Sequence, residues 1–233
     1  CTLSTLPLLI GVPMCGRFTM ATQTEALEER FHAQLSTERA APTYNAATSQ
    51  AQLTILNDHP QAIVRATWGF VPAWADGRPD VKPLINARAE TVATKPFFRD
   101  AFKRKRCLVL ADGFYEWKRA GKSKVPYRIA LQTEEPFAFA GIWSLVHDAQ
   151  GVVQPTFALL TTEANTLVAQ IHTRMPVILR EQDEAAWLNP TLSLDAAQAL
   201  LVPYPAARLM AYEVSSRVNS ATSNSPDLLQ PRA

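Results

Sequence analysis

The residues best suited to chemistry begin with a cysteine near the start of the sequence. Cys15 directly follows Met14 and precedes Gly16 and Arg17 in the stretch VPMCGRFTM. A methionine in this position is typical of an initiator that is later removed. Its removal leaves Cys15 with a free α-amine beside its thiol, so that one residue carries two nucleophiles. This arrangement predicts that Cys15 is the nucleophile of a catalytic site.

Three further segments place a polar side chain beside apolar neighbours. Asn86 lies in PLINARAETV, Glu116 lies between two aromatic residues in GFYEWK, and His172 lies in AQIHTRMPVIL. A nucleophile needs a base or a proton shuttle, which His172 or Glu116 can supply. A carboxylate beside aromatic rings can exchange protons near neutral pH, because desolvation disfavours its charged form. An amide such as Asn86 can orient a reacting oxygen without titrating.

Each of these residues also has an ordinary structural explanation. A carboxylate on a strand often faces water, and a histidine at the end of a helix is usually a cap or a satisfied core group. Asn86 also suits a turn. The functional interpretation therefore rests on the set of Cys15, Asn86, Glu116 and His172 taken together.

Positive charge is concentrated in the middle of the chain. Residues 95–128 contain eleven Lys or Arg and three Asp or Glu, whereas the whole chain has a net charge of +2. The segment therefore carries +8 and the remainder −6. A basic segment in an otherwise acidic chain is typical of a protein that binds a polyanion. A solvated charged face would give the same pattern.

Several side chains near the candidate catalytic segments fit a nucleic-acid partner. Arg17, Arg88 and Arg174 suit bidentate contacts with phosphate. Tryptophans can stack on exposed bases, although most of them are buried in proteins. The tryptophans considered for this role are Trp68, Trp74 and Trp117.

Length and composition fit a single domain with a sizeable core, because the chain has 233 residues of which 47% are apolar. No stretch is long and apolar enough to cross a membrane. Residues 1–13 lack the basic start and the cleavage site of a signal peptide. The cysteines, Cys1, Cys15 and Cys107, form no CxxC pair, which argues against a zinc ribbon or a disulfide framework. We expect a cytoplasmic protein without a metal or a cofactor.

The elements that must position these residues are mostly strands. Thr22, three residues before Glu25, is the signature of a capping box and predicts a helix over residues 22–35. Residues 51–57 and 62–68 flank a turn and predict a hairpin. Further strands are expected within residues 107–131, around a basic turn at Ala120-Gly121, and over residues 136–143, 155–162 and 208–215. Short helices are expected over residues 163–172, 181–188 and 194–201.

These elements predict an α+β fold, because hairpins imply antiparallel pairing and the helices are few and short. We expect a single domain, with a curved, barrel-like, mostly antiparallel sheet flanked by short helices. The domain is expected over residues 14–222. Residues 1–13 are expected to be a leader absent from the mature protein, and the polar residues 223–233 a flexible tail.

The chain carries a series of motifs in a fixed order from Met14 to Asn219. They are MCGRF (14–18), YN (44–45), WGFVPAW (68–74), NARAE (86–90), RCLVLADGFYEW (106–117), AGIW (140–143), TTEAN (161–165), IHTRMP (171–176) and VSSRVN (214–219). In this combination they resemble the SRAP family, the SOS-response-associated peptidases. The resemblance implies an SRAP-like domain that forms covalent crosslinks to abasic sites in single-stranded DNA.

The resemblance also implies roles for individual residues. Cys15 resembles the nucleophile that becomes the mature amino terminus, and Asn86, Glu116 and His172 match the other active-site positions. The positions implied to hold the DNA backbone are Arg17, Arg88, Thr161 and Arg174. The positions implied to lie near the bases and a single-strand/double-strand junction are Trp74 and Trp117. The implied product is a thiazolidine crosslink, with removal of the residue before Cys15 and a lyase side activity, in a protein expected to be a monomer.

Two other functions are compatible with the residues. A cysteine peptidase acting on other proteins would use Cys15, His172 and Glu116 and would need no free amine. A non-catalytic binder of single-stranded DNA would show salt-sensitive binding and leave no covalent adduct. Neither alternative accounts for the position of Cys15 directly behind a methionine.

Overall fold

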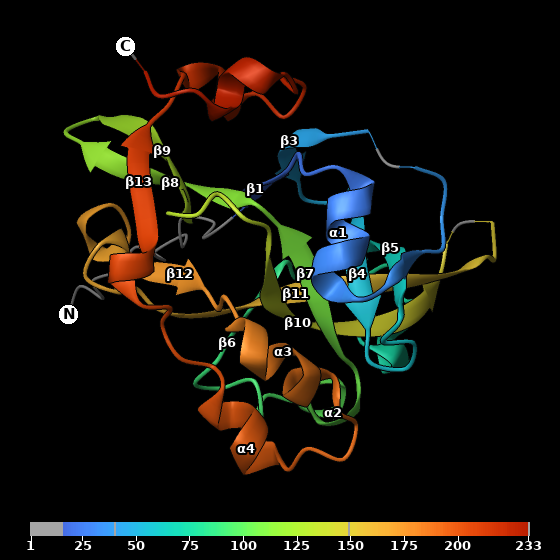
Figure 1. Ribbon diagram of the computed structural model, residues 1–233. Helices are drawn as coiled ribbons and strands as arrows, with labels where there is room; N and C mark the ends of the chain where they lie inside the picture. Colours follow the sequence, from blue (N-terminus) through green and yellow to red (C-terminus); the bar gives the residue numbers. More distant parts are fainter. Residues whose placement is uncertain (1–15, 40, 149, 233) are drawn as a thin grey trace, which may run out of the picture.

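The computed structural model describes residues 16–39, 41–148 and 150–232 (Figure 1). The strands are β1 (Arg17–Met20), β2 (Gln34–Leu35), β3 (Thr43–Ala47), β4 (Ala51–Leu56), β5 (Ala62–Trp68), β6 (Asn86–Arg88), β7 (Arg106–Ala111), β8 (Gly113–Ala120), β9 (Ser123–Leu131), β10 (Phe137–His147), β11 (Val153–Glu163), β12 (Arg174–Pro176) and β13 (Leu209–Glu213). The α-helices are α1 (Thr24–Phe31), α2 (Arg99–Arg104), α3 (Glu181–Leu188) and α4 (Leu194–Ala199). The short 3₁₀ helices are η1 (Ala73–Ala75), η2 (Val168–Gln170), η3 (Ala206–Arg208), η4 (Ser216–Asn219) and η5 (Pro226–Leu229).

The larger sheet closes on itself. Its strands run in the order β12-β11-β10-β7-β4-β5-β2, and β11 also pairs in parallel with β5, at Thr156↔Thr67 and Phe157↔Trp68. The strands β11, β10, β7, β4 and β5 therefore form a closed ring, which leaves no free edge between them. Trp68 and Phe157 stack inside it, with ring centroids 6.2 Å apart. The predicted barrel-like sheet is confirmed.

A second sheet of the described chain carries much of the candidate site. It has the order β13-β9-β8-β1-β3, with antiparallel pairs throughout. The hairpin of β8 and β9 turns at Gly121, whose φ of 62° is a left-handed conformation that favours glycine. The predicted strands over residues 107–131 and the turn at Ala120-Gly121 are confirmed, as are the strands within 136–143, 155–162 and 208–215.

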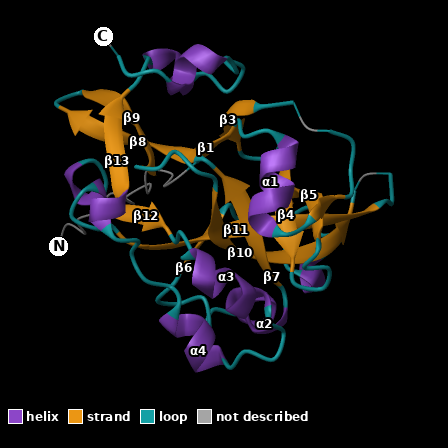
Figure 2. Cartoon of the chain, viewed as in Figure 1, coloured by secondary structure: helices purple, strands orange, loops and turns teal. Residues whose placement is uncertain are grey.

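Helices flank the sheets, as expected for the predicted α+β class (Figure 2). Helix α1 lies in front of β4 and β5, and α2, α3 and α4 gather below the closed ring in the view of Figure 1. Leu27 and Phe31 of α1 are buried, which confirms the apolar face predicted from their spacing. No helix in the described residues is long and apolar enough to span a membrane.

The predicted capping box at the start of α1 is wrong. The residue before the helix is Gln23, and it makes no side-chain cap. The Thr22 hydroxyl instead donates to Asp112 Oδ2 at 3.1 Å, and the backbone N–H of Thr22 donates to the same oxygen at 3.0 Å. The threonine that the local pattern assigns to the helix is therefore bound by a buried carboxylate that lies far away in the sequence, directly before β8.

The helix predicted over residues 163–172 is also wrong, because only η2 forms there. The Asn165 carboxamide oxygen accepts the N–H groups of Leu167 at 3.1 Å and Val168 at 2.9 Å, which starts one helical turn. Strand β12 then pairs back on β11, with Glu163 opposite Arg174. The chain must reverse within these ten residues, so no longer helix fits.

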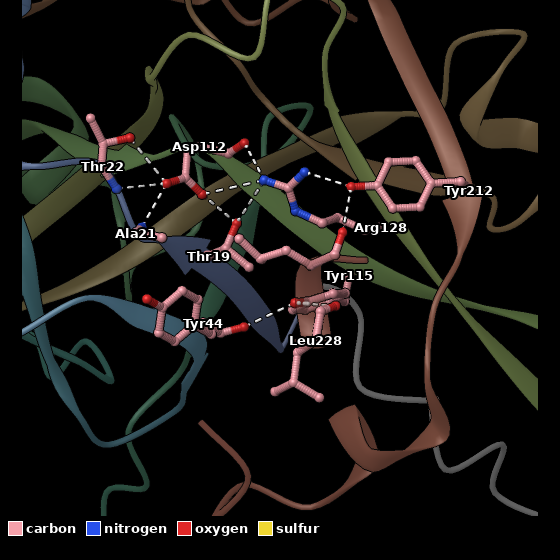
Figure 3. Close-up of polar contacts among 10 residues, drawn as sticks. Thr19, Ala21, Thr22, Tyr44, Asp112, Tyr115, Arg128, Tyr212 and Leu228 are labelled. Atoms are coloured by element: carbon pink, nitrogen blue, oxygen red, sulfur yellow. Dashed lines mark hydrogen bonds and ion pairs between the residues drawn. The ribbon is translucent and has the colours of Figure 1, made fainter. Parts of the chain in front are cut away.

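The carboxyl-terminal residues are packed rather than free. Leu228 in η5 has no exposed surface and joins Tyr115, Val214 and Val218 in a small apolar cluster. The Tyr115 hydroxyl donates to the carbonyl of Tyr44 at 2.9 Å and to that of Leu228 at 3.3 Å (Figure 3). The segment expected to be a flexible tail, residues 223–233, thus includes one buried apolar residue, Leu228.

A buried ion pair joins β1, β8 and β9 (Figure 3). Asp112 lies directly before β8, and its carboxylate accepts hydrogen bonds from the Thr19 hydroxyl at 2.5 Å and from the Ala21 N–H at 2.6 Å. Arg128 Nη2 lies 3.5 Å from the same carboxylate, and Arg128 Nη1 donates to the Tyr212 hydroxyl at 2.9 Å. A Cβ atom on Gly113 would come within 2.9 Å of the guanidinium, so glycine is needed for this approach. The pair fixes β8, which carries Glu116.

Candidate active site

A cleft of about 930 Å³ lies beside the second sheet, where several distant segments meet. The residues that line it are Gly16, Arg17, Thr48, Ile85, Glu116, Trp117, Lys118, Arg119, Lys124, Gln170, Ile171, His172, Thr173 and Asn219. Two of the four predicted catalytic residues, Glu116 and His172, are therefore on its walls. The cleft is the place where the sequence-predicted site comes together in the described part of the chain.

Glu116 is held on β8 with very little exposure to water. Its side chain is 2% exposed, and the β8–β9 register sets it opposite Tyr127. The register of β1 against β8 pairs Phe18 with Phe114 and Thr19 with Gly113. Continued by two residues, this antiparallel register sets Gly16 opposite Glu116. The strand pairing therefore brings the start of the described chain to the buried carboxylate.

Cys15, the predicted nucleophile, lies outside the described residues. Its neighbour Gly16 lines the cleft together with Glu116 and His172. The free cysteine within the described residues, Cys107, is fully buried in β7, and burial raises the pKa of its thiol well above the usual range. A raised pKa suppresses the thiolate, so Cys107 is unsuited to nucleophilic chemistry.

Arg17 is anchored to the carboxyl-terminal part of the chain. Its guanidinium donates to Asn45 Oδ1 at 2.9 Å, to the Val218 carbonyl at 3.0 Å and to the Asn219 carbonyl at 3.3 Å. Partial burial lowers the pKa of Arg17 from its ordinary value, but an arginine remains charged at neutral pH. These contacts hold a positive charge at the mouth of the cleft, where a phosphate could approach.

His172 follows η2 and has a partner in either protonation state. Its Nδ1 atom lies 3.1 Å from the backbone N–H of Arg174, which can donate to a neutral ring. The same Nδ1 lies 3.2 Å from the Arg174 carbonyl, which can accept from a protonated ring. The other ring nitrogen therefore remains free of this backbone contact in both states. This arrangement suits a residue that takes up and releases a proton.

Asn86 and Arg88 lie on β6, which pairs in parallel with β11. Asn86 is half-buried and follows Ile85, a cleft residue, whereas Arg88 is exposed. Thr161 lies opposite Arg88 but has no exposed surface, and its hydroxyl donates to the Ala87 carbonyl at 3.4 Å. The implied contact of Thr161 with the DNA backbone is therefore not available to its side chain in this structure.

Arg174 is engaged by a carboxylate that the sequence interpretation did not assign to it. Its guanidinium donates to both oxygens of Glu90, at 2.5 and 2.9 Å, and to the Thr161 carbonyl at 2.7 Å. These hydrogen bonds from Arg174 lower the pKa of Glu90, which stays ionised. A phosphate must share Arg174 with this carboxylate.

The tryptophans differ in exposure. Trp68 has no exposed surface and donates to the Ile85 carbonyl at 2.9 Å, so its proposed stacking on bases is wrong. Trp117 lines the cleft and donates to Asn219 Oδ1 at 2.7 Å. Trp74 is 54% exposed and lies in a separate hollow of about 270 Å³ with Phe97. Trp74 and Trp117 therefore both remain available for stacking, at different places.

The sequence interpretation missed the contribution of the carboxyl-terminal segment to the site. Asn219 touches Trp117, and the carbonyls of Val218 and Asn219 hold Arg17. The motifs YN and VSSRVN contain Asn45, Val218 and Asn219, and these were the available signal. It also missed that the cations of residues 95–128 have different environments. Arg106 and Arg128 are buried, whereas Lys118, Arg119 and Lys124 line the cleft.

Comparison with known proteins identifies the family. The model of the family "SOS response associated peptidase (SRAP)" matches residues 14–221. The chain is 43% identical over 222 residues to "Abasic site processing protein YoqW" of Bacillus subtilis, covering 93% of this chain and 99% of that protein. It is 30% identical over 228 residues to "Abasic site processing protein YedK" of Escherichia coli, covering 94% of this chain and all of that protein.

A crystal structure of a protein from Bacteroides thetaiotaomicron superposes with a TM-score of 0.84 at 28% identity, covering 94% of this chain and 100% of that one. This agreement extends the likeness from sequence motifs to the arrangement of both sheets. With a family match over residues 14–221 and full-length relatives, the chain belongs to the SRAP family.

Proposed function

We propose that this protein processes abasic sites in DNA by forming a covalent crosslink through Cys15 as the mature amino-terminal residue. The observation that carries the proposal is that Gly16, the neighbour of Cys15, lines one cleft with the buried carboxylate of Glu116 and with His172. The pairs of β1 with β8 are Phe18↔Phe114 and Thr19↔Gly113, and a continuation of this register leads from Gly16 to Glu116. The names of the relatives, abasic site processing proteins, support the same substrate.

The chemistry needs an amino terminus at Cys15. A free α-amine has a pKa of about 7.7 to 8.0, so much of it is neutral near neutral pH and can attack the aldehyde of a ring-opened abasic site. Loss of water from the adduct gives an imine. The Cys15 thiol then adds across the C=N bond, sulfur bonding to carbon and the thiol proton passing to nitrogen. The product is a five-membered thiazolidine ring, and the net reaction releases one water.

Glu116 and His172 supply the proton transfers. Glu116 shuttles protons during addition of the amine and loss of water, from a position that excludes bulk solvent. His172 protonates the sugar oxygen as the ring opens, because its Nδ1 is satisfied in both protonation states. Asn86 orients the sugar. If the imine instead loses a proton from the sugar, β-elimination breaks the strand, and ring closure competes with this lyase reaction by consuming the imine.

Basic and aromatic side chains bind the DNA strand. Arg17 and Arg88 contact phosphates, and Arg174 does so while it shares its guanidinium with Glu90. Trp117 and Trp74 contact bases or a single-strand/double-strand junction, and Trp74 lies in a hollow of its own with Phe97. Thr161 positions Arg174 through its carbonyl. The domain spans residues 14–222 and acts as a monomer. The residue before Cys15 is removed by the protein's own peptidase activity or by a methionine aminopeptidase.

The proposal is tested with protein that begins at Cys15 and single-stranded DNA containing one abasic site. A denaturant-resistant adduct is expected, with the mass of protein plus DNA less one water by intact mass spectrometry. An undamaged strand of the same sequence is the control. Absence of the adduct with fully folded protein would refute the crosslinking function, and cleavage of an unrelated protein substrate would favour the peptidase alternative.

Glu116→Gln is expected to slow adduct formation by about 100-fold or more, because general acid–base catalysis contributes at least that much. The substitution keeps the size of the side chain and removes its ability to exchange protons. Glu135→Gln is the matched control, since Glu135 is exposed in the turn after β9 and lies outside the cleft. The measurement is the single-turnover rate of adduct formation on denaturing gels. A rate unchanged from the parent would remove Glu116 from the mechanism.

A further inference from the structure

The β8–β9 hairpin carries the densest positive charge beside the cleft. Residues 117–125, WKRAGKSKV, contain Lys118, Arg119, Lys122 and Lys124 and no acidic residue. All four side chains belong to exposed residues, and in the described part of the chain none of them forms an ion pair. Figure 1 shows the hairpin at the upper left edge of the molecule, projecting beyond the other strands.

The strand pairing within the hairpin places two of these positive charges opposite each other. The register sets Arg119 directly opposite Lys124, which brings their Cβ atoms to about 4.5–5.5 Å. Like charges directly opposite on neighbouring strands destabilise a sheet. Among the described residues no carboxylate relieves this pair. An anionic ligand would relieve it.

The hairpin also stands at the right place for a ligand that occupies the cleft. Lys118, Arg119 and Lys124 line the same hollow as Glu116 and His172. From Glu116 to the turn at Gly121 the strand spans about 16 Å, at about 3.3 Å per residue. Along the axis of a duplex, each strand carries one phosphate per about 3.4 Å. An extended single strand spaces its phosphates further apart, so the arm spans a few nucleotides counted from the buried carboxylate.

We propose that the β8–β9 hairpin is a phosphate-binding arm that holds the DNA backbone on one flank of the damaged nucleotide. The four cations contact phosphates without reading sequence. The existence of the arm is independent of the crosslinking chemistry, whereas its placement relative to the lesion rests on the proposed function. Because the arm forms one wall of the cleft, it serves only one of the two flanks.

The first experiment measures binding of undamaged single-stranded DNA as a function of salt. Each phosphate contact contributes about 0.7 to the slope of log K against log[salt] on single strands. The double variant Arg119→Gln/Lys124→Gln is therefore expected to lose about 1.4 from the slope, and so is Lys118→Gln/Lys122→Gln. The matched control is Arg180→Gln/Arg208→Gln, which removes two exposed arginines from a hollow that shares no residue with the cleft.

A slope that falls in both hairpin variants and not in the control supports the arm. Parental slopes in both hairpin variants would overturn it. Circular dichroism and melting temperature establish that each variant is folded before its slope is compared.

The second experiment uses a stable abasic-site analogue without an aldehyde, so that no covalent bond forms. Shortening one flank of this DNA to a single nucleotide is expected to abolish the affinity difference between the parent and the hairpin variants. Shortening the other flank is expected to leave that difference unchanged. Equal effects of both flanks would overturn the one-sided arm. The hairpin variants could show a reduced slope on undamaged DNA while their affinity for the analogue depends on neither flank. That result would support the phosphate contacts and refute the placement of the lesion in the cleft.

Discussion

Protein that retains Met14 is expected to form no denaturant-resistant adduct with abasic DNA, whereas protein that begins at Cys15 forms it readily. The reason is chemical, because an amide nitrogen is not basic and cannot give an imine with an aldehyde. Only the terminal amine has the neutral lone pair that the reaction needs near pH 7. The measurement compares the two proteins, each verified by intact mass, on denaturing gels with the same abasic strand.

Variants at Cys15 separate the amine from the thiol. Cys15→Ala and Cys15→Ser in protein that begins at residue 15 keep the amine, so borohydride should trap an imine with abasic DNA, and strand cleavage should persist. Neither variant can close the thiazolidine ring, so the stable adduct is expected to disappear. Cys107 cannot replace the lost thiol, since it is fully buried in β7. A stable adduct from Cys15→Ala at the parental yield would show that Cys15 is not the crosslinking residue.

Asp112→Ala is expected to destabilise the protein by about 3–5 kcal/mol, the usual effect of removing one partner of a buried ion pair. Asp112 and Arg128 are each 6% exposed, so the loss leaves the guanidinium without its carboxylate in a nearly dry environment. The N–H groups of Ala21 and Thr22 lose their acceptor as well. The free energy of unfolding from urea titration, followed by tryptophan fluorescence, measures the effect.

The control for this variant is an ion pair on the surface. Arg78 and Asp80 are 2.9 Å apart, but their side chains are 55% and 66% exposed. Asp80→Ala is therefore expected to leave the free energy of unfolding nearly unchanged, because an exposed ion pair contributes little to stability. Similar effects from Asp112→Ala and Asp80→Ala would show that the buried network contributes little to holding β8. Adduct formation by Asp112→Ala, assayed where the variant is folded, reports whether Glu116 stays in place.

Local patterns predicted most strands, because alternation and turn residues act over a few neighbours. The hairpin of β4 and β5 and the hairpin of β8 and β9 were both predicted for this reason. The failures occurred where a distant side chain decided the outcome. The Thr22 hydroxyl donates a hydrogen bond to Asp112, which lies 90 residues away. The pairing of β12 with β11 limits residues 163–172 to one helical turn. Neither partner is visible in the local sequence.

Residue types alone indicated part of the candidate site. Glu116 and His172 line the cleft as the sequence indicated, and Asn86 follows a residue that lines it. The sequence could not reveal that Glu90 occupies the guanidinium of Arg174, or that Thr161 has no exposed surface. Both facts depend on how β6, β11 and β12 lie beside one another. Composition also could not distinguish the buried cations Arg106 and Arg128 from those on the surface.

The anchoring of Arg17 by Val218 has a consequence for biosynthesis. The two residues are separated by 201 positions, so this part of the cleft cannot assemble until η4 has left the ribosome. A nascent or prematurely terminated polypeptide that lacks η4 has neither the carbonyls that hold Arg17 nor the Asn219 amide beside Trp117. If the proposed function holds, a polypeptide is expected to capture a reactive aldehyde only after η4 has been synthesised.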